Sequence, residues 1–219
     1  MSARDVTEAL YVWTPFLAGG FIWNVLVSLC AMAIGTLLGA VLATMRLSHR
    51  RATVRASLVA TGLTRNIPTF VFLFYLAFLI PVEIELGGHL YAFPAWLKAS
   101  LALAVAVIGF VSDNLSEALR RWRSHDHAAA LMFIPNWTSY FLVIVMASST
   151  ASVIGVGELV ARCNTVIGAV GKPELMLWIY LYAMLWFFLC CYPLTLLMRQ
   201  VKTWMSRRLP QRTPELVPA

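Results

Sequence analysis

The sequence predicts an all-α membrane protein with five transmembrane helices, because it combines long apolar segments with basic residues placed between them. The chain has 219 residues, of which 60% are hydrophobic and 12% charged, and its mean hydropathy is +0.77. A bilayer core is crossed by about 20 mostly apolar residues in helical form, since lipid offers no hydrogen-bond partner to exposed backbone. We expect one domain over residues 1–219, with spans at 21–45, 58–80, 97–119, 131–155 and 175–198.

The basic residues predict the orientation of these spans. Thirteen of the seventeen Lys and Arg residues lie at 46–65, 120–123 and 199–212. Such stretches face the cytoplasm, so the N-terminus is expected outside and the C-terminus inside. The net charge of +7 would also suit nucleic acid, but these residues lie at span ends, where they contact lipid headgroups. Membrane lipid, and no nucleic acid, is therefore the expected partner.

Four features are expected around the first two spans. Residues 6–17 are interpreted as a short amphipathic segment on the outer interface. Gly35 and Gly39 have small-xxx-small spacing, which fits packing against a neighbouring span or homodimerisation. Pro68 disfavours helix at the residue before it, which predicts a break near the cytoplasmic end of the second span. The loop 81–94, with two glycines and two prolines, is expected to be irregular.

Two carboxylates lie near the end of the third span. Such groups are costly in a membrane and usually face a protein interior or an aqueous cavity. Glu117 is followed by Arg120 and Arg121, which indicates an ion pair at the interface. Asp113 lies one turn deeper and is either a solute-binding group, for an ammonium or guanidinium, or a structural contact to Asn114 or to another subunit.

The end of the fourth span is rich in hydroxyls, with Ser148–Ser152 followed by Gly155 and Glu158. Hydroxyls are tolerated in a membrane when they bond back to their own helix or across to another one. Small side chains also leave room for a packed neighbour or for a solute. The candidate solute-binding residues are therefore Asp113, Asn114, Ser148, Ser149 and Glu158.

At this point the sequence resembles the membrane permease subunits of bacterial ABC importers for polar amino acids, of the histidine, glutamine and arginine type. The first span and its basic loop are similar to the opening helix of that family. Residues 65–68 (RNIP) resemble its Arg-Gly/Asn-Thr-Pro motif, and 115–120 (LSEALR) resemble Leu-Ala-Glu-Ile-Val-Arg. Most specifically, residues 151–159 (ASVIGVGEL) are close to its Ala-Ser-Val-Ile-Gly-Val-x-Glu-Leu signature.

The resemblance implies a type I importer fold in a bacterial inner (plasma) membrane. It further implies a second permease subunit, expected to be a different chain, together with two ATP-binding subunits and an extracellular solute-binding protein. Transport would follow alternating access, with ATP and Mg used by the partner ATPase. The sequence has no phosphate-binding GxxxxGK[ST] loop, so no cofactor and no enzymatic activity are expected of this chain itself.

The sequence also departs from the family. Residues 120–135 form a shortened version of the cytoplasmic loop that couples family members to their ATPase, in which His127, Ala128, Ala129 and Pro135 match the coupling motif in part. Phe110 stands where the family often has Asn. Met146–Ser149 replaces its Lys-Asp-Thr-Ser.

The spacing of the histidines and cysteines disfavours both a metal site and a disulfide. His125 and His127 are two residues apart, so they do not share a helix face, and a metal needs further ligands. The four cysteines show neither disulfide nor metal spacing.

Three functions remain open at this stage. The first is a transport subunit that forms half of an amino-acid importer. The second is a degenerate, non-transporting permease-like subunit with an assembly or regulatory role. A membrane enzyme is the weakest, because no nucleophile, base and orienting group come together in the spans.

Overall fold

The computed structural model describes residues 3–86 and 88–208, and Arg212 of the third basic stretch lies outside them. The described chain is helical apart from one short hairpin. In order, the elements are α1 (Ala3–Arg46), α2 (Arg51–Asn66), α3 (Thr69–Leu79), β1 (Glu83–Leu86), β2 (His89–Ala92), α4 (Ala95–Arg123), α5 (His127–Leu131), α6 (Phe133–Ala147), the 3-10 helix η1 (Ser148–Ile154), α7 (Leu159–Val170) and α8 (Pro173–Arg208).

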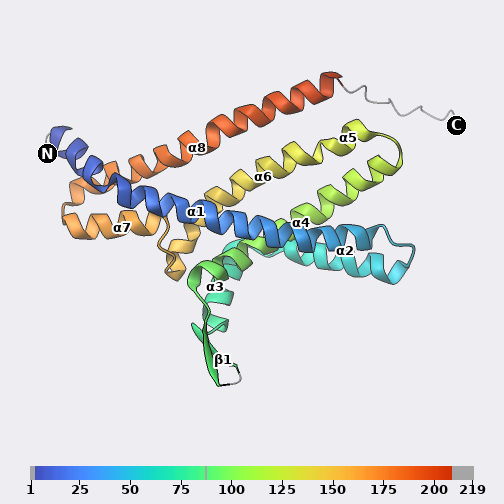
Figure 1. Ribbon diagram of the computed structural model, residues 1–219, viewed down its shortest axis with the longest axis horizontal. Coiled ribbons are helices and arrows are strands. Elements are labelled where there is room, and N and C mark those ends of the chain that lie inside the picture. The colour runs from blue at the N-terminus through green and yellow to red at the C-terminus, as the bar shows by residue number, and fades with distance from the viewer. Residues whose placement is uncertain (1–2, 87, 209–219) are drawn as a thin grey trace.

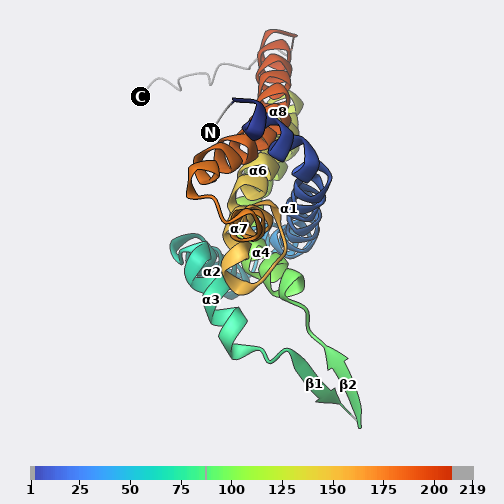
Figure 2. The same ribbon diagram turned by 90° about the vertical axis from the view of Figure 1, so that its left-hand side faces the viewer.

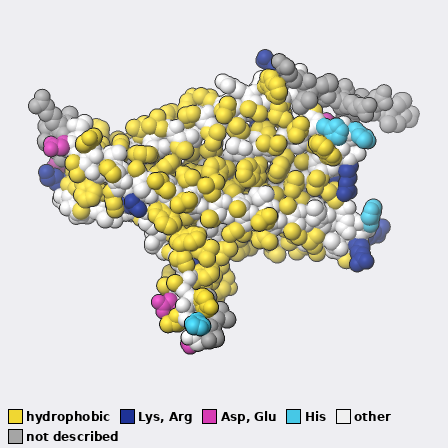
Figure 3. Space-filling model, viewed as in Figure 1, with side chains coloured by type: hydrophobic (Ala, Val, Ile, Leu, Met, Phe, Trp, Pro, Cys, Tyr) yellow, Lys and Arg dark blue, Asp and Glu magenta, His cyan; other side chains and the backbone are white. Residues whose placement is uncertain are grey.

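The predicted fold class is confirmed. Four helical segments are long and apolar enough to cross a membrane, and the bent pair α2–α3 brings the count to five if the pair is one broken span. Figure 1 shows these helices as one elongated bundle, and Figure 3 shows hydrophobic side chains along its sides. Lys, Arg and His side chains gather where α2 begins and α4 ends, which we call the basic end (Figure 3).

The first span is longer than expected. Helix α1 continues from Ala3 to Arg46 with Pro15 inside it, so the prediction of a separate amphipathic segment at 6–17 is wrong. Residues such as Leu17 and Phe21 lie in one apolar cluster with Leu159 and Cys163 of α7. Burial against α7 and α8 therefore keeps this N-terminal part helical.

Helices α1 and α4 form the closest contact of the bundle. A Cβ atom at Gly35 would lie 2.9 Å from the carbonyl oxygen of Ala104, and one at Gly39 would lie 2.9 Å from that of Ile108. Only glycine allows two helix backbones to approach in this way. The two glycines thus serve packing within the chain.

The second predicted span is broken in its middle. Helix α2 ends at Asn66, Ile67 and Pro68 are extended, and α3 then leaves at 92° to α2. Pro68 explains the break, because its ring excludes helical geometry at Ile67. Figures 1 and 2 show α3 and the hairpin projecting sideways from the bundle.

A buried lysine holds the far end of α3. Lys98 on α4 donates from Nζ to the carbonyl oxygens of Ile80 at 2.5 Å and Ala77 at 3.3 Å. Carbonyls in the last turn of a helix lack internal partners, and a cation there is favourable. Lys98 therefore fixes α3 to the start of α4.

The loop at 81–94 is an antiparallel hairpin, which corrects the expectation of an irregular loop. Glu83 pairs with Ala92 and Leu86 with His89. Strand β1 (EIEL) alternates polar and apolar residues, as strands do, whereas β2 (HLYA) does not. Gly88, with φ +82°, supplies the left-handed geometry that the turn requires.

The hydroxyl-rich run forms the 3-10 helix η1. Ser149, Thr150 and Ser152 each donate back to a carbonyl three residues earlier, at 2.8 to 3.0 Å. Of the two expected arrangements, these three hydroxyls take the first, since they bond back to carbonyls of the preceding turn rather than across to another helix. Gly155, with φ +87°, ends the segment.

Candidate functional site

A cavity of about 560 Å³ lies where α2 turns into α3, against α4 and α6. Its position on α4, at residues 106–114, places it inside the predicted third span. A volume of this size is typical of small-molecule sites. The cavity is lined by Thr64, Arg65, Asn66, Ile67, Pro68, Thr69, Ala106, Phe110, Asp113, Asn114 and Tyr140.

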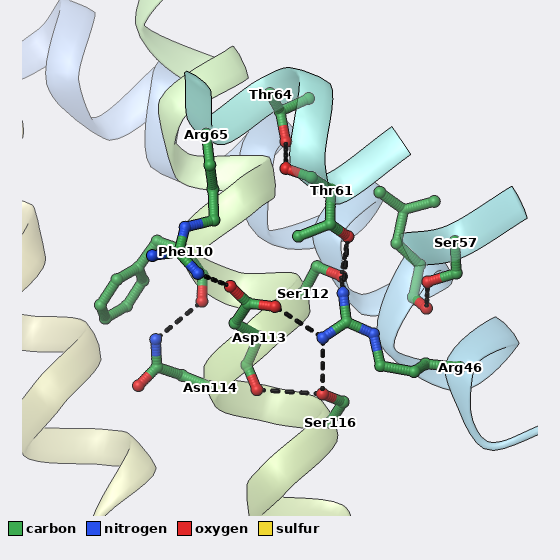
Figure 4. A network of polar contacts seen from close by, with 11 residues as sticks. Arg46, Ser57, Thr61, Thr64, Arg65, Phe110, Ser112, Asp113, Asn114 and Ser116 are labelled. Carbon is green, nitrogen blue, oxygen red and sulfur yellow. Dashed lines mark hydrogen bonds and ion pairs between the residues drawn. The ribbon is translucent and has the colours of Figure 1, made fainter. Parts of the chain in front are cut away.

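Asp113 is bound by two arginines from two other helices. Arg46, the last residue of α1, donates from Nη1 to Oδ1 at 2.6 Å, and Arg65 of α2 donates to Oδ2. The carboxylate at this depth is therefore paired within the chain, rather than to Asn114. Figure 4 shows both guanidinium groups converging on it.

The two arginines differ in their surroundings. The Arg46 side chain is only 9% exposed, and it also donates to Thr61 at 2.8 Å, Ser112 at 3.2 Å and Ser116 at 3.4 Å. Its Nε has no partner in the described part of the chain. The Arg65 side chain is 63% exposed. Arg46 thus belongs to a packed polar network (Figure 4), whereas Arg65 stands at the edge of the cavity.

An aromatic pair forms the facing wall. The rings of Phe110 and Tyr140 are stacked, with centroids 3.9 Å apart and planes within 2°. The Tyr140 hydroxyl donates to the carbonyl of Ala106 at 3.3 Å. Beside them, Asn114 donates to the carbonyl of Phe110 at 2.9 Å, which leaves its amide oxygen available. The cavity therefore combines one flat apolar side with one charged side.

Ser148, Ser149 and Glu158 do not line this cavity, unlike Asp113 and Asn114. Glu158 is fully buried and caps α7, accepting from the backbone N–H groups of Val160 at 3.0 Å and Ala161 at 2.8 Å. Asn24 of α1 donates to both Glu158 and Ser148 at 2.9 Å. The structure therefore places Glu158 and Ser148 in a buried joint between α1, η1 and α7.

Burial also perturbs the acidity of this joint. It raises the pKa of Glu158, and hydrogen bonds from Asn24 and from the backbone of Val160 and Ala161 offset part of that rise. A capping carboxylate at a helix N-terminus is favourable, which explains why an acidic residue is tolerated there.

The residues predicted to couple to an ATPase lie together at the basic end. His127, Ala128 and Ala129 form the start of α5, which Asp126 caps by accepting from the Ala129 N–H at 3.2 Å. Pro135 is buried in the first turn of α6. Between α4 and this segment lies a recess of about 290 Å³, lined by Asn114, Glu117, Ala118, Arg121, Ala129, Met132, Phe133 and Asn136. The predicted interfacial ion pair is present in it, as Glu117 with Arg121 at 2.8 Å.

Sequence reasoning overlooked four residues of these sites. Arg46 was assigned to orientation alone, Arg65 to orientation and to the 65–68 motif, and Tyr140 and Asn24 were not singled out. For the arginines a signal existed, since a deep carboxylate needs a cation and both lie at the same end of the bundle as Asp113. No comparable signal marks Tyr140.

Comparison with known proteins supports the fold. No protein-family model and no curated protein matches the chain. Its structure is similar to the crystal structure of an amino acid ABC transporter with histidines, at a TM-score of 0.73 and 18% sequence identity. The likeness covers 90% of this chain and 97% of that one. The chain therefore has an ABC transporter-like, all-α membrane fold.

Proposed function

We propose that this chain is the transmembrane subunit of an ATP-driven amino-acid importer, in a bacterial inner membrane. It would form half of a translocation pathway that works by alternating access. The observation that carries the proposal is the 560 Å³ cavity with charged lining, set within the predicted spans of a transporter-like fold. Ionisable side chains within membrane spans are costly, and where they line a cavity they usually mark the path of a solute or an ion.

The geometry supports specific roles within the pathway. Asp113 and Asn114 line the cavity and are the solute-facing residues of the proposal. Ser148 and Glu158 would instead hold the α1–α7 joint, and the described hydrogen bond of the Ser149 side chain goes to the carbonyl of Met146 in α6. The subunit belongs, by its motifs, with importers of the histidine, glutamine and arginine type.

The partners follow from what this chain lacks. Two ATP-binding subunits would supply hydrolysis with ATP and Mg, and an extracellular binding protein would deliver the solute. A second permease subunit would complete the pathway. The sideways projection of α3 and the hairpin (Figure 2), with exposed Phe78, Tyr75 and Tyr91, fits such a neighbour.

Coupling would take place at the basic end. The 290 Å³ recess beside α5 exposes Ala129 and Met132 between α4 and α6. A shortened loop would dock on the ATPase through this segment, with His127–Ala129 as its contact and Pro135 fixing the start of α6.

The test is reconstitution. The chain is co-purified with its ATPase, placed in liposomes with the second permease and the binding protein, and assayed for ATP hydrolysis with glutamine, glutamate, histidine and arginine. Hydrolysis stimulated by one of these amino acids, with uptake of the same one, is the expected result. Neither stimulation nor uptake by any of them would contradict the proposal.

A second candidate is a degenerate permease-like subunit with an assembly or regulatory role. It is favoured by the brevity of α5, which has five residues and leads directly into α6. This candidate predicts stable co-assembly with the ATPase, but hydrolysis that ignores every solute.

A further inference from the structure

We propose that Arg65 is a carboxylate-binding residue of the cavity. In the absence of solute, the carboxylate of Asp113 pairs with the Arg65 guanidinium in place of the solute carboxylate. The proposal rests on the proposed function and names the chemical group that the site recognises. It concerns a solute with a carboxylate, either the α-carboxylate of an amino acid or a carboxylate in its side chain.

The first support is the charge of the site. Two guanidinium groups, of Arg46 and Arg65, face the single carboxylate of Asp113. Of these three groups, Arg65 and Asp113 line the cavity and Arg46 does not, and no other charged side chain is among the described residues that line it. The cluster as a whole therefore carries one positive charge in excess, which disfavours an ammonium group and favours an anion.

The second support is the division of labour between the arginines. Arg46 makes four hydrogen bonds and is 9% exposed, so its guanidinium is fixed beside Asp113. In the part of the chain that the structure describes, the guanidinium of Arg65 bonds only to Asp113 and is 63% exposed. Arg65 can therefore leave Asp113 for another carboxylate without leaving Asp113 unpaired.

The third support is the match between the group and the space beside it. A guanidinium presents a planar fork that binds a carboxylate through two parallel hydrogen bonds. Around Arg65, the cavity offers the polar side chains of Asn66, Thr69 and Asn114, and the stacked rings of Phe110 and Tyr140. A small solute could place its carboxylate on Arg65 and its remaining atoms against this wall.

The exchange gives the site a built-in competitor. Asp113 holds Arg65 when the cavity is empty of solute, and a solute carboxylate must displace it. The net charge of the arginine–aspartate cluster would then fall from one positive to zero, because one further carboxylate joins it. Removing Asp113 should consequently strengthen carboxylate binding rather than weaken it.

The experiment uses the full chain in lipid nanodiscs and measures binding by saturation-transfer NMR. The probes are L-glutamate, L-glutamine and 4-aminobutanamide, which is glutamine without its α-carboxylate. The wild type should bind glutamate or glutamine and not 4-aminobutanamide. Glutamine binding as well as glutamate assigns the α-carboxylate, whereas binding of glutamate alone assigns the side-chain carboxylate.

Three variants complete the test. Arg65→Gln should weaken carboxylate binding at least about tenfold, as loss of a charged hydrogen-bonded pair does, and Arg65→Lys should retain part of it. Arg55→Gln removes the same charge from an exposed position on the same helix and should change nothing. Asp113→Asn should tighten binding, and it decides the question if Arg65→Gln does not fold.

Several results would overturn the proposal. These are equal binding of 4-aminobutanamide, unchanged affinity in Arg65→Gln, weaker binding in Asp113→Asn, or no binding of any probe by the wild type. The assay needs no ATPase, so its failure is separate from a failure of solute-stimulated hydrolysis in liposomes.

Discussion

Asn24 binds Glu158 across 134 residues of sequence and links the first helix to the N-terminus of α7. Its Nδ2 donates to Oε2 of Glu158 at 2.9 Å, and its Oδ1 accepts the backbone N–H of Leu159 at 3.1 Å. Both residues are fully buried. The joint therefore fixes the end of the bundle opposite the basic end, and its strength depends on the charge state of one carboxyl group.

The charge of Glu158 should make stability fall as the pH rises. Because burial raises the pKa of this carboxyl above its ordinary value of 4.5, the folded chain holds the proton more tightly than the unfolded chain. The associated stability is complete below the unfolded value and is lost as pH rises through the folded pKa. Between the unfolded and the folded pKa of Glu158, we expect the unfolding temperature of the wild type to drop more with rising pH than that of Glu158→Gln. Scanning fluorimetry in detergent measures both. Parallel curves for the two proteins would contradict this.

The two arginines on Asp113 should differ in their effect on stability. Arg46→Gln breaks a buried, charged network and should lower the free energy of unfolding by about 2 kcal/mol. Arg65→Gln breaks an exposed pair and should cost no more than about 1 kcal/mol. Titration with SDS in mixed micelles measures both. Equal losses of unfolding free energy in the two variants would show that the buried network around Arg46 adds no stability beyond that of the exposed Arg65 pair.

Adding a methyl group between α1 and α4 should be destabilising. A Cβ at Gly39 would meet the side chain of Val111 at 2.7 Å and the carbonyl of Ile108 at 2.9 Å, so Gly39→Ala should cost about 1–3 kcal/mol through overpacking. The control is Gly168→Ala in α7, where the new atom meets nothing within 4 Å. That change should be stabilising by up to about 1 kcal/mol, since alanine favours helix. The same micelle titration compares them.

The orientation can be tested with two exposed histidines. His89 lies in β2 of the hairpin and His49 in the loop after α1. In intact cells, a membrane-impermeant maleimide should modify His89→Cys and leave His49→Cys unmodified, with the parent chain as background. Labelling of His49→Cys alone would reverse the proposed orientation.

If the recess at the basic end binds the ATPase, a large side chain placed in the recess should prevent coupling. Ala129→Arg would fill the recess, whereas Ser124→Arg places the same side chain on an exposed turn nearby. We expect the first change to abolish solute-stimulated hydrolysis and the second to preserve it, in the reconstituted complex. Full coupling in Ala129→Arg would remove the recess from the mechanism.

Length and hydropathy were enough to predict an all-α membrane fold with four to five candidate spans, because the bilayer imposes a fixed requirement on every helix that crosses it. The bend at Pro68 could be expected as a break, but its angle of 92° depends on where α4 and Lys98 hold α3. The hairpin was not predicted because the glycines and prolines of residues 81–94 indicated an irregular loop, and strands of four residues are too short to give a clear pattern.

The candidate site was only half predictable. A deep Asp113 could be recognised from its depth alone, since a carboxylate there needs a reason. The sequence does not show which cations pair with Asp113. Arg46 and Arg65 are 67 and 48 residues away in sequence, and three helices must pack before these side chains converge. Glu158 was assigned to solute, whereas in the structure it caps α7 through the N–H groups of Val160 and Ala161 and accepts from Asn24, which is 134 residues away in sequence.

The interlocking of α1 with α4 at Gly35 and Gly39 decides which parts of the chain can rearrange. Neither helix can slide past the other without driving a side chain into a backbone carbonyl, so the pair would travel as one stiff pillar. Changes of shape must then be absorbed where the chain already departs from α-helix, at Ile67–Pro68 and in η1. Asp113 lies on this α1–α4 pair and Ile67–Pro68 lines the same cavity, so a change of shape at that break would alter the cavity beside a carboxylate that stays in place.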